Sequence, residues 1–352
     1  MISRIVRSLS TATLAAAVAV LAWPQALGLQ NTEFFAHAVS FRGVFALGAG
    51  VLALVFIAGL IVSRARRFFA MSLVVTLLFG AVNVGILSTR GVDTIESASA
   101  AEQQLGSVTV LAWNTLGGAP GADAIADLAL AEQADVVTLP ETTEATGIAV
   151  AEAMRAGGQP MWVHTLAFDL VSDARSTTVL ISPELGSYEV TNSAAAGPPG
   201  NTSVLPSVVA TPVTGTGPTI VAVHAVAPIR YQMDGWRADL DWLAEQCTFT
   251  ADAPGNMIMA GDFNATVDHM AGRAGDGSPD AVLGDCGDAA TASGAGAVGT
   301  WPTAVPALLG SPIDHVLATP NWRVGGVRVI KSLDDSGSDH RPVVATLTDT
   351  AP

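Results

Sequence analysis

The chain is poor in lysine, cysteine and aromatic residues. Lys331 is its only lysine, and two of its 352 residues are cysteine. Beyond residue 90, nine basic residues face 30 acidic ones, which leaves a net charge of −21. Proteins that bind the phosphate backbone of nucleic acids rely on clustered Lys and Arg, so this balance argues against nucleic acid as a partner. A lysine-poor, acidic composition can also be a habit of a whole proteome, and composition alone leaves both explanations open.

The two cysteines, Cys247 and Cys286, both lie beyond residue 90. In an oxidising compartment they predict one disulfide, which would close a loop of about 40 residues. Two buried free thiols are the alternative.

Hydrophobic residues make up 50% of the chain, and their excess is concentrated before residue 90. Three apolar runs there are each long enough to cross a hydrocarbon core of ~30 Å as a helix. They are Leu9–Leu29, Phe41–Val62 and Phe68–Leu87. We therefore expect residues 1–89 to form an anchor of three transmembrane helices.

Five of the seven basic residues before residue 91 lie before the first run or between the second and third. They are Arg4 and Arg7 before the first run, and Arg64, Arg66 and Arg67 between the second and third. The positive-inside rule then predicts a multi-pass protein of the cell membrane, with a cytoplasmic N-terminus and the residues after 90 outside. A cleaved signal peptide is the alternative for the first run, and it leaves this orientation unchanged. Residues 90–106 are polar and small, which is typical of a short stalk.

Residues 107–352 are expected to form one catalytic domain of the α/β class. Short, β-branched and almost continuously apolar runs recur along them, as in strands that are buried on both faces. Helical stretches at 122–132, 143–156 and 233–247 alternate with these runs. The Gly- and Ala-rich segments 193–201, 271–278 and 289–299 are expected to be loops.

Polar side chains occur where several of these runs end or begin. Asn114 follows Leu-Ala-Trp, Glu141 follows Val-Val-Thr-Leu-Pro, and His224 follows Val-Ala-Val. Further along are the strings Gly-Asp-Phe-Asn at 261–264, Ile-Asp-His-Val at 313–316 and Ser-Asp-His-Arg-Pro at 338–342. Each string alone is weak, because an Asp after a Gly is commonly a turn residue and a lone His is commonly structural. Their order along the chain is what indicates a site.

In that order the strings resemble the endonuclease/exonuclease/phosphatase superfamily, which includes DNase I-like nucleases, inositol polyphosphate phosphatases and neutral sphingomyelinases. The resemblance covers residues 107–349. The anchor and the Gly-Thr-Trp-Pro string at 299–302 also resemble a bacterial membrane-anchored subgroup that includes a glycopeptide-resistance-associated membrane protein. The resemblance implies a four-layer α/β/β/α sandwich whose site lies at one edge of two sheets.

The same resemblance implies roles for the polar residues. Asn114, Glu141 and Asp339 would hold Mg²⁺ or Mn²⁺, hard cations that prefer oxygen ligands. The catalytic set would be His340 against the scissile phosphate, Asp314 orienting it, Asp262 positioning or deprotonating the attacking water, Asn264 on a phosphate oxygen, and His224 stabilising charge on the non-bridging oxygens. One departure is Pro140, where the family commonly has Gln before the metal-binding Glu.

Other polar residues are left without a catalytic role. Arg175 would contact phosphate or, as the alternative, lie in a solvated loop. His164, His269 and His315 have no assigned role. His315 follows Asp314 on a strand, so its side chain should point to the opposite face and be structural.

The sequence thus predicts a metal-dependent phosphoesterase that acts on a lipid or other small phosphoester at the outer membrane face. An exported endo- or exonuclease and a non-catalytic binding module of the same fold are the alternatives. No protein partner follows from the sequence. The choice of substrate, of diesterase or monoesterase, of metal and of oligomeric state lies beyond it.

Overall fold

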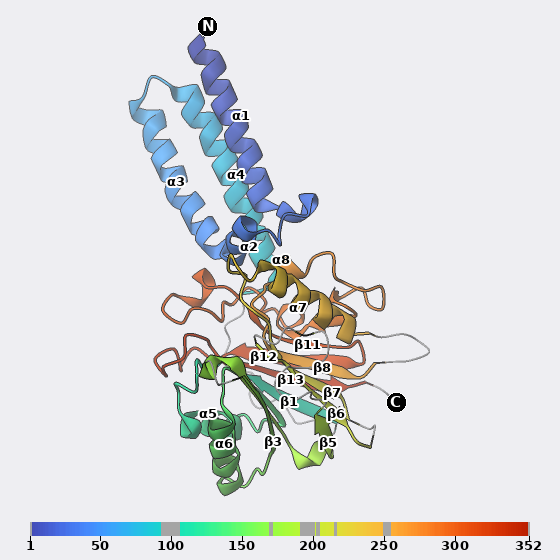
Figure 1. The fold of residues 1–352 in the computed structure, drawn as a ribbon. Helices are drawn as coiled ribbons and strands as arrows, with labels where there is room; N and C mark the ends of the chain where they lie inside the picture. Colours follow the sequence, from blue (N-terminus) through green and yellow to red (C-terminus); the bar gives the residue numbers. More distant parts are fainter. Residues whose placement is uncertain are drawn as a thin grey trace.

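The computed structural model describes residues 2–92, 106–168, 172–190, 201, 205–214, 217–248 and 255–350. Long helices form a stem at one end of the molecule, and two sheets with their covering helices form a body at the other (Figure 1). Both the N-terminus and the turn between α3 and α4 lie at the end of the stem that is remote from the sheets (Figure 1).

The stem contains α1 (Ile2–Ala22), α3 (Arg42–Val62) and α4 (Arg66–Arg90), with η1 (Pro24–Leu27) and α2 (Glu33–Ser40) between the first two. Within the described residues, α3 and α4 are long and apolar enough to cross a membrane. The first predicted span, Leu9–Leu29, does not form one helix. Pro24 disfavours helical geometry at the residue before it, and α1 ends at Ala22. Two of the three predicted spans therefore form helices that are long and apolar enough to cross a membrane, and the three-span anchor stays a prediction.

The body contains two mixed sheets. The first has the order β12-β13-β1-β2-β4-β3 and the second β5-β6-β7-β8-β11-β10-β9. The strands are β1 (Ser107–Ala112), β2 (Val136–Pro140), β3 (Trp162–Ala167), β4 (Ser176–Ile181), β5 (Tyr188–Val190), β6 (Val208–Pro212), β7 (Thr219–His224), β8 (Met257–Asp262), β9 (Ala281–Leu283), β10 (Cys286–Asp288), β11 (Asp314–Ala318), β12 (Trp322–Val329) and β13 (Val343–Asp349).

The layers follow from three apolar cores. One core fills the space between the two sheets, with side chains such as Val110, Ile220 and Val316. A second packs α5 (Ala122–Ala131) and α6 (Glu144–Ala156) on the outer face of the first sheet, and a third packs α7 (Met233–Gln246) on the second. The predicted α/β class is confirmed, and the order of layers is helix, sheet, sheet, helix.

Several elements were not predicted, among them α8 (Val267–Met270), β9 and β10. The segment 289–299, expected to be a loop, begins with the short helix α9 (Ala289–Ala292), because Asp288 accepts a capping hydrogen bond from the Thr291 amide. The edge strands β3 and β5 were not predicted, since their burial is too irregular to give an apolar run. The loop expected at 193–201 lies outside the described residues, apart from Asn201.

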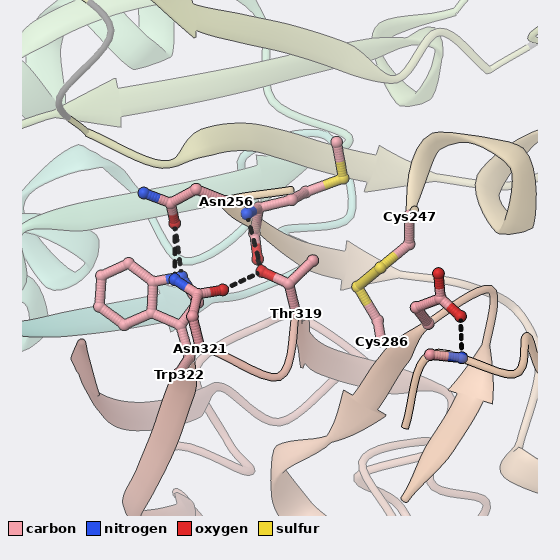
Figure 2. Close-up of a disulfide and its surroundings, with 9 residues drawn as sticks. Cys247, Asn256, Cys286, Thr319, Asn321 and Trp322 are labelled. Atoms are coloured by element: carbon pink, nitrogen blue, oxygen red, sulfur yellow. Dashed lines mark hydrogen bonds between the residues drawn. A yellow bond between two sulfur atoms is a disulfide. The ribbon is translucent and has the colours of Figure 1, made fainter. Parts of the chain in front are cut away.

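The predicted disulfide between Cys247 and Cys286 is confirmed (Figure 2). It joins the end of α7 to β10, and both residues are buried. Nearby, the Trp322 indole donates a hydrogen bond to Asn256 at the start of β8 (Figure 2). The covering helix and β10, the strand next to the edge strand β9, are thus covalently linked.

The stem is joined to the body through Asp268, which is buried in the short helix α8 (Val267–Met270). Arg42, at the start of α3, donates two hydrogen bonds to its carboxylate, from Nε at 2.8 Å and from Nη2 at 2.7 Å. Arg90, at the end of α4, donates another at 2.8 Å. Burial raises the pKa of Asp268, but these guanidinium groups outweigh it and hold the pKa below its usual range.

Backbone and histidine contacts extend this junction. The ring of His269 accepts the Thr266 amide at Nδ1 and donates from Nε2 to the Ala36 carbonyl of α2. The carbonyl oxygens of Arg90 and Gly91 accept hydrogen bonds from the loop after α9. The predicted stalk, residues 90–106, therefore begins in direct contact with the body rather than as a spacer, and residues 93–105 lie outside the described part of the chain.

Candidate active site

The strand order brings the predicted site residues to one edge of the body. In the first sheet β1 and β2 run parallel, so Asn114 and Glu141 leave their strands at the same edge. Because β13 is antiparallel to β1, the residues just before β13, Asp339 and His340, reach that edge as well. The register alone therefore gathers these four side chains.

The second sheet supplies the facing half. Parallel pairing of β7 with β8 places His224 opposite Asp262, and antiparallel pairing of β11 with β8 places Asp314 opposite the same residue. Asn264 follows two residues after Asp262, in the turn that ends β8. All predicted catalytic and metal-binding residues thus lie together where the two sheets meet.

His340 is held between carboxylates. Its Nδ1 donates to Asp314 Oδ2 at 2.9 Å, and its Nε2 lies 3.9 Å from Asp262 Oδ2 and 4.0 Å from Asp339 Oδ1. Burial lowers the pKa of His340, but the charges of Asp314 and Asp262 outweigh it and raise the pKa to about 10. The ring is consequently an imidazolium at neutral pH, because the carboxylates beside it stabilise the charged form.

The Asp262 carboxylate has a pKa close to neutral pH. Burial and the charge of Asp314 raise its pKa to about 7, against opposing effects of His340 and of hydrogen bonds from Asn264 and Asn114. The side-chain nitrogen Nδ2 of Asn264 donates to Asp262 at 3.2 Å and to the Ala225 carbonyl at 2.9 Å. Asn264 thus supports Asp262, and a hydrogen bond to phosphate would require it to give up one of these partners.

Glu141 stands in a left-handed backbone conformation, with φ of 56°, directly after Pro140. Such a conformation in a residue with a Cβ costs free energy and is concentrated at functional sites. Burial raises the pKa of Glu141 and the hydrogen bond from Asn114, 3.0 Å long, opposes that rise. Pro140 ends β2, and its carbonyl accepts the Thr115 amide, so this residue keeps one hydrogen bond to the segment after β1 although it has no N–H to donate.

His224 lies 3.8 Å from Glu141 Oε1 through Nε2, and its Nδ1 lies 3.5 Å from the Thr177 hydroxyl. Burial and the charge of His340 lower its pKa to about 3, so its ring is neutral. If Thr177 donates to Nδ1, the proton sits on Nε2 and faces the site. His224 can therefore act as a neutral hydrogen-bond donor to a phosphate oxygen.

Two sets of residues could hold a divalent cation. In the predicted set, Asp339 Oδ1 is buried without a hydrogen-bond partner and Glu141 lies close enough for the Asp339 charge to raise its pKa. A buried, unpaired carboxylate oxygen is stabilised by a cation, so these residues fit a hard metal ion. Asn114 turns its amide nitrogen to Glu141 and its oxygen to the Leu116 amide, and it must rotate by half a turn to act as a ligand.

The second set is Asp262, Asp314 and His340, whose candidate ligand atoms all lie within 4.8 Å of one another. Here His340 is protonated and already bonded to Asp314, so its ring offers no lone pair to a metal. The first set offers oxygen ligands alone, which hard cations prefer, whereas in the second set His340 already donates to Asp314.

Several supporting residues were not predicted. Ser338 donates to the Asn114 carbonyl at 2.6 Å and accepts the His340 amide, which fastens the two motif segments together. Trp301 donates from Nε1 to Asp339 Oδ2 at 2.9 Å. Arg341 is buried and donates to carbonyl oxygens of the segment 299–305, which carries Trp301. These contacts join residues far apart in sequence, and the Ser-Asp-His-Arg-Pro and Gly-Thr-Trp-Pro strings were the sequence signals that contained most of them.

The remaining residues behave as structural groups or lie apart. His315 points away from the site, as predicted, and donates to Asp288 at 3.0 Å and to the Ala265 carbonyl at 2.8 Å. His269 belongs to the stem junction, and His164 lies on the edge strand β3. Arg175 ends η2 (Asp173–Arg175), two residues before Thr177, so phosphate contact stays a prediction.

The model of the endonuclease/exonuclease/phosphatase family matches residues 111–340, from β1 to His340. No curated protein sequence shows significant similarity to the chain. Among solved structures, a humanized D. rerio TDP2 has a TM-score of 0.50 at 17% identity, covering 69% of this chain and 99% of its own.

A member of the same family from Beutenbergia cavernae has a TM-score of 0.49 at 20% identity, covering 69% of this chain and 72% of its own. One from Bacteroides vulgatus has a TM-score of 0.47 at 17% identity, covering 69% and 99%. At these identities such likeness concerns the fold alone.

Proposed function

The chain belongs to the endonuclease/exonuclease/phosphatase family, whose members hydrolyse phosphoester bonds with a divalent metal, and from this premise we propose that it cleaves a phosphoester of a lipid or lipid-linked substrate at the outer face of a membrane. The proposal rests on three groups that meet at one edge of the two sheets. They are the imidazolium of His340, the Asp262 carboxylate with its near-neutral pKa, and the carboxylates of Glu141 and Asp339, which fit a metal ion. Phosphoester hydrolysis needs these components together.

Asp262 is the proposed general base. Its pKa of about 7 suits a group that must accept a proton at neutral pH. It takes a proton from the attacking water as the new P–O bond forms, the ester P–O bond breaks, and the departing oxygen takes a proton from solvent. His340, kept charged by Asp314, and neutral His224 stabilise the negative charge on the non-bridging oxygens.

Asn114, Glu141 and Asp339 would hold Mg²⁺ or Mn²⁺. The unpaired Oδ1 of Asp339 and the raised pKa of Glu141 support this assignment. A bound divalent ion supplies neutralisation of charge on the phosphate and leaving oxygens. Trp301 fixes the other Asp339 oxygen, which orients the free oxygen toward the site.

Three observations support a membrane-borne substrate. The helices α3 and α4 can each cross a bilayer, and the stem is fastened to the body through Asp268. The Arg64–Arg67 turn lies at the end of the stem remote from the sheets, which favours a body outside the cytoplasm (Figure 1). The acidic balance of the residues after 90 disfavours a polyanion.

The test is a phosphoester panel run on the full chain in lipid nanodiscs with Mg²⁺ or Mn²⁺. Lipid phosphates, phosphodiesters and diphosphates stand beside single-stranded and double-stranded DNA. We expect release of phosphate or head group from a lipid, and a loss on the order of 100-fold or more in His340→Ala and Glu141→Ala. His164→Ala, on the edge strand β3, is the matched control and should retain activity.

Each other outcome points to a definite alternative. Equal turnover in EDTA would exclude the metal assignment. Cleavage of DNA without lipid hydrolysis would establish an exported nuclease, which the family permits. A folded protein that hydrolyses nothing on the panel would identify a binding module of this fold.

A further inference from the structure

An apolar groove lies between α1, α2 and α3, where the stem meets the body. Leu21, Phe34, Phe35, Phe41, Val44 and Phe45 line it, and its volume is about 920 Å³. Four of the 11 phenylalanines of the chain thus fall within residues 34–45 and face one groove. A hollow of this size and lining is of the kind that holds an apolar ligand.

The groove is not a sealed core. The Phe34 side chain is 67% exposed and Val44 45%, so a large apolar surface is left uncovered. Uncovered apolar area of this extent indicates a binding surface for apolar partners. The polar residues Thr32, Glu33 and His37 also line it, next to the first residues of α2.

Direct contacts connect the groove to the catalytic edge. The Phe41 ring, in the groove wall, lies 6.1 Å from the Trp301 ring, centroid to centroid. Trp301 donates its indole hydrogen bond to Asp339, whose other oxygen lies 4.0 Å from His340 Nε2. A single aromatic contact and one hydrogen bond therefore separate the groove wall from the proposed metal-binding carboxylate.

We propose that the groove binds a hydrocarbon chain of the substrate lipid while the lipid's phosphate lies at His340 and Asp262. This inference rests on the proposed function and adds the part of the substrate that the enzyme holds outside its polar site. The hydrocarbon chain would move from the bilayer to the equally apolar wall of the groove. Placing the head group at the polar edge therefore exposes little apolar area to water. Neighbouring bilayer lipid and a second copy of this chain are the competing occupants.

The test compares two identical substitutions on α3. Val44→Trp fills the groove, whereas Val51→Trp places the same side chain two turns further along the helix, at a position that is 57% exposed and does not line it. Full-chain protein in nanodiscs is assayed with a long-chain and a short-chain ester of the same phosphate head group. We expect Val44→Trp to lower the ratio of long-chain to short-chain kcat/KM about tenfold, the effect of roughly two lost methylene contacts. Val51→Trp should keep the wild-type ratio.

A second measurement reads binding directly. A long-chain alkyl phosphate with a photoreactive group at the chain end should crosslink to residues 33–45 in wild type, and less in Val44→Trp. Crosslinks spread evenly over α1, α3 and α4 would show bilayer lipid only and overturn the inference, as would an unchanged ratio. Dimer crosslinks between copies at the groove would assign it to self-association. Failure to hydrolyse either ester, with crosslinking at 33–45 intact, would remove the proposed function and leave the lipid site standing.

Discussion

Two histidine–carboxylate pairs stand on opposite faces of β11 and have different tasks. Asp314 accepts a hydrogen bond from His340 at the catalytic edge and stabilises its protonated ring. Asp288 does the same for His315 on the other face of the strand. Both ring nitrogens of His315 donate, to Asp288 and to the Ala265 carbonyl, so its ring must be protonated. His315 thereby holds the turn that carries Asp262 and Asn264.

This second pair predicts a pH dependence of stability. Although burial lowers the pKa of His315, the Asp288 carboxylate outweighs it and raises the pKa above its ordinary 6.5. A raised histidine pKa contributes stability that is complete below the unfolded value and is lost as pH rises through the folded value. We expect the unfolding temperature of the wild type to fall more between about pH 6 and about pH 9 than the unfolding temperature of His315→Gln.

The control for this prediction is His164→Gln. Burial lowers the pKa of His164, so its removal should not reduce the alkaline loss. Equal pH slopes for wild type and His315→Gln would show that folding does not raise the pKa of His315.

At the scale of elements, α8 couples the stem to the catalytic edge. Asp268 forms ion pairs with both Arg42 and Arg90, and its short helix follows directly on the turn after Asp262. Asp268→Asn would leave two guanidinium groups without their counter-charge, and for the buried Arg42 alone this costs about 3–5 kcal/mol. We expect a large fall in the unfolding temperature of the full chain in detergent.

Asp241→Asn is the matched control, because this carboxylate is 62% exposed and pairs with Arg273 at the surface. Surface ion pairs contribute about 0–1 kcal/mol, so its unfolding temperature should stay near that of wild type. If the two variants unfold together, the buried junction contributes nothing to the stability of the chain.

The sequence predicted the elements whose signal is local. Short apolar runs predicted β1, β2, β7 and β8, and the polar residues at their ends lie together because parallel strands deliver their ends to one edge. The resemblance then supplied the roles. The features that the sequence did not predict depend on contacts between residues far apart in the chain. Ser338 contacts Asn114 at a sequence separation of 224, and Arg42 contacts Asp268 at a separation of 226. No local pattern carries such information.

At the scale of the whole molecule, the disulfide secures the second sheet. Cys247 and Cys286 are separated by 39 positions, and closing a loop of this length stabilises the folded state by roughly 4 kcal/mol in the chain-entropy model. We expect Cys247→Ser with Cys286→Ser to unfold at distinctly lower denaturant concentration than wild type.

Reductant provides the internal check on this prediction. It should lower the midpoint of the wild type toward that of the double variant and leave the double variant unchanged. A wild-type midpoint insensitive to reductant under unfolding conditions would mean that the bridge adds no stability. The result also bears on compartment, since such a bridge persists where thiols are kept oxidised.

The clamp of Arg42 and Arg90 on Asp268 has a kinetic consequence. It holds the catalytic edge at a constant height and tilt relative to the helices, so the edge cannot swing out into bulk solution to find its ester. For the proposed lipid substrate, encounter then becomes a two-dimensional search by lateral diffusion. The turnover rate of such an enzyme follows the mole fraction of substrate in the bilayer and is diluted by inert lipid, whatever the total amount in suspension.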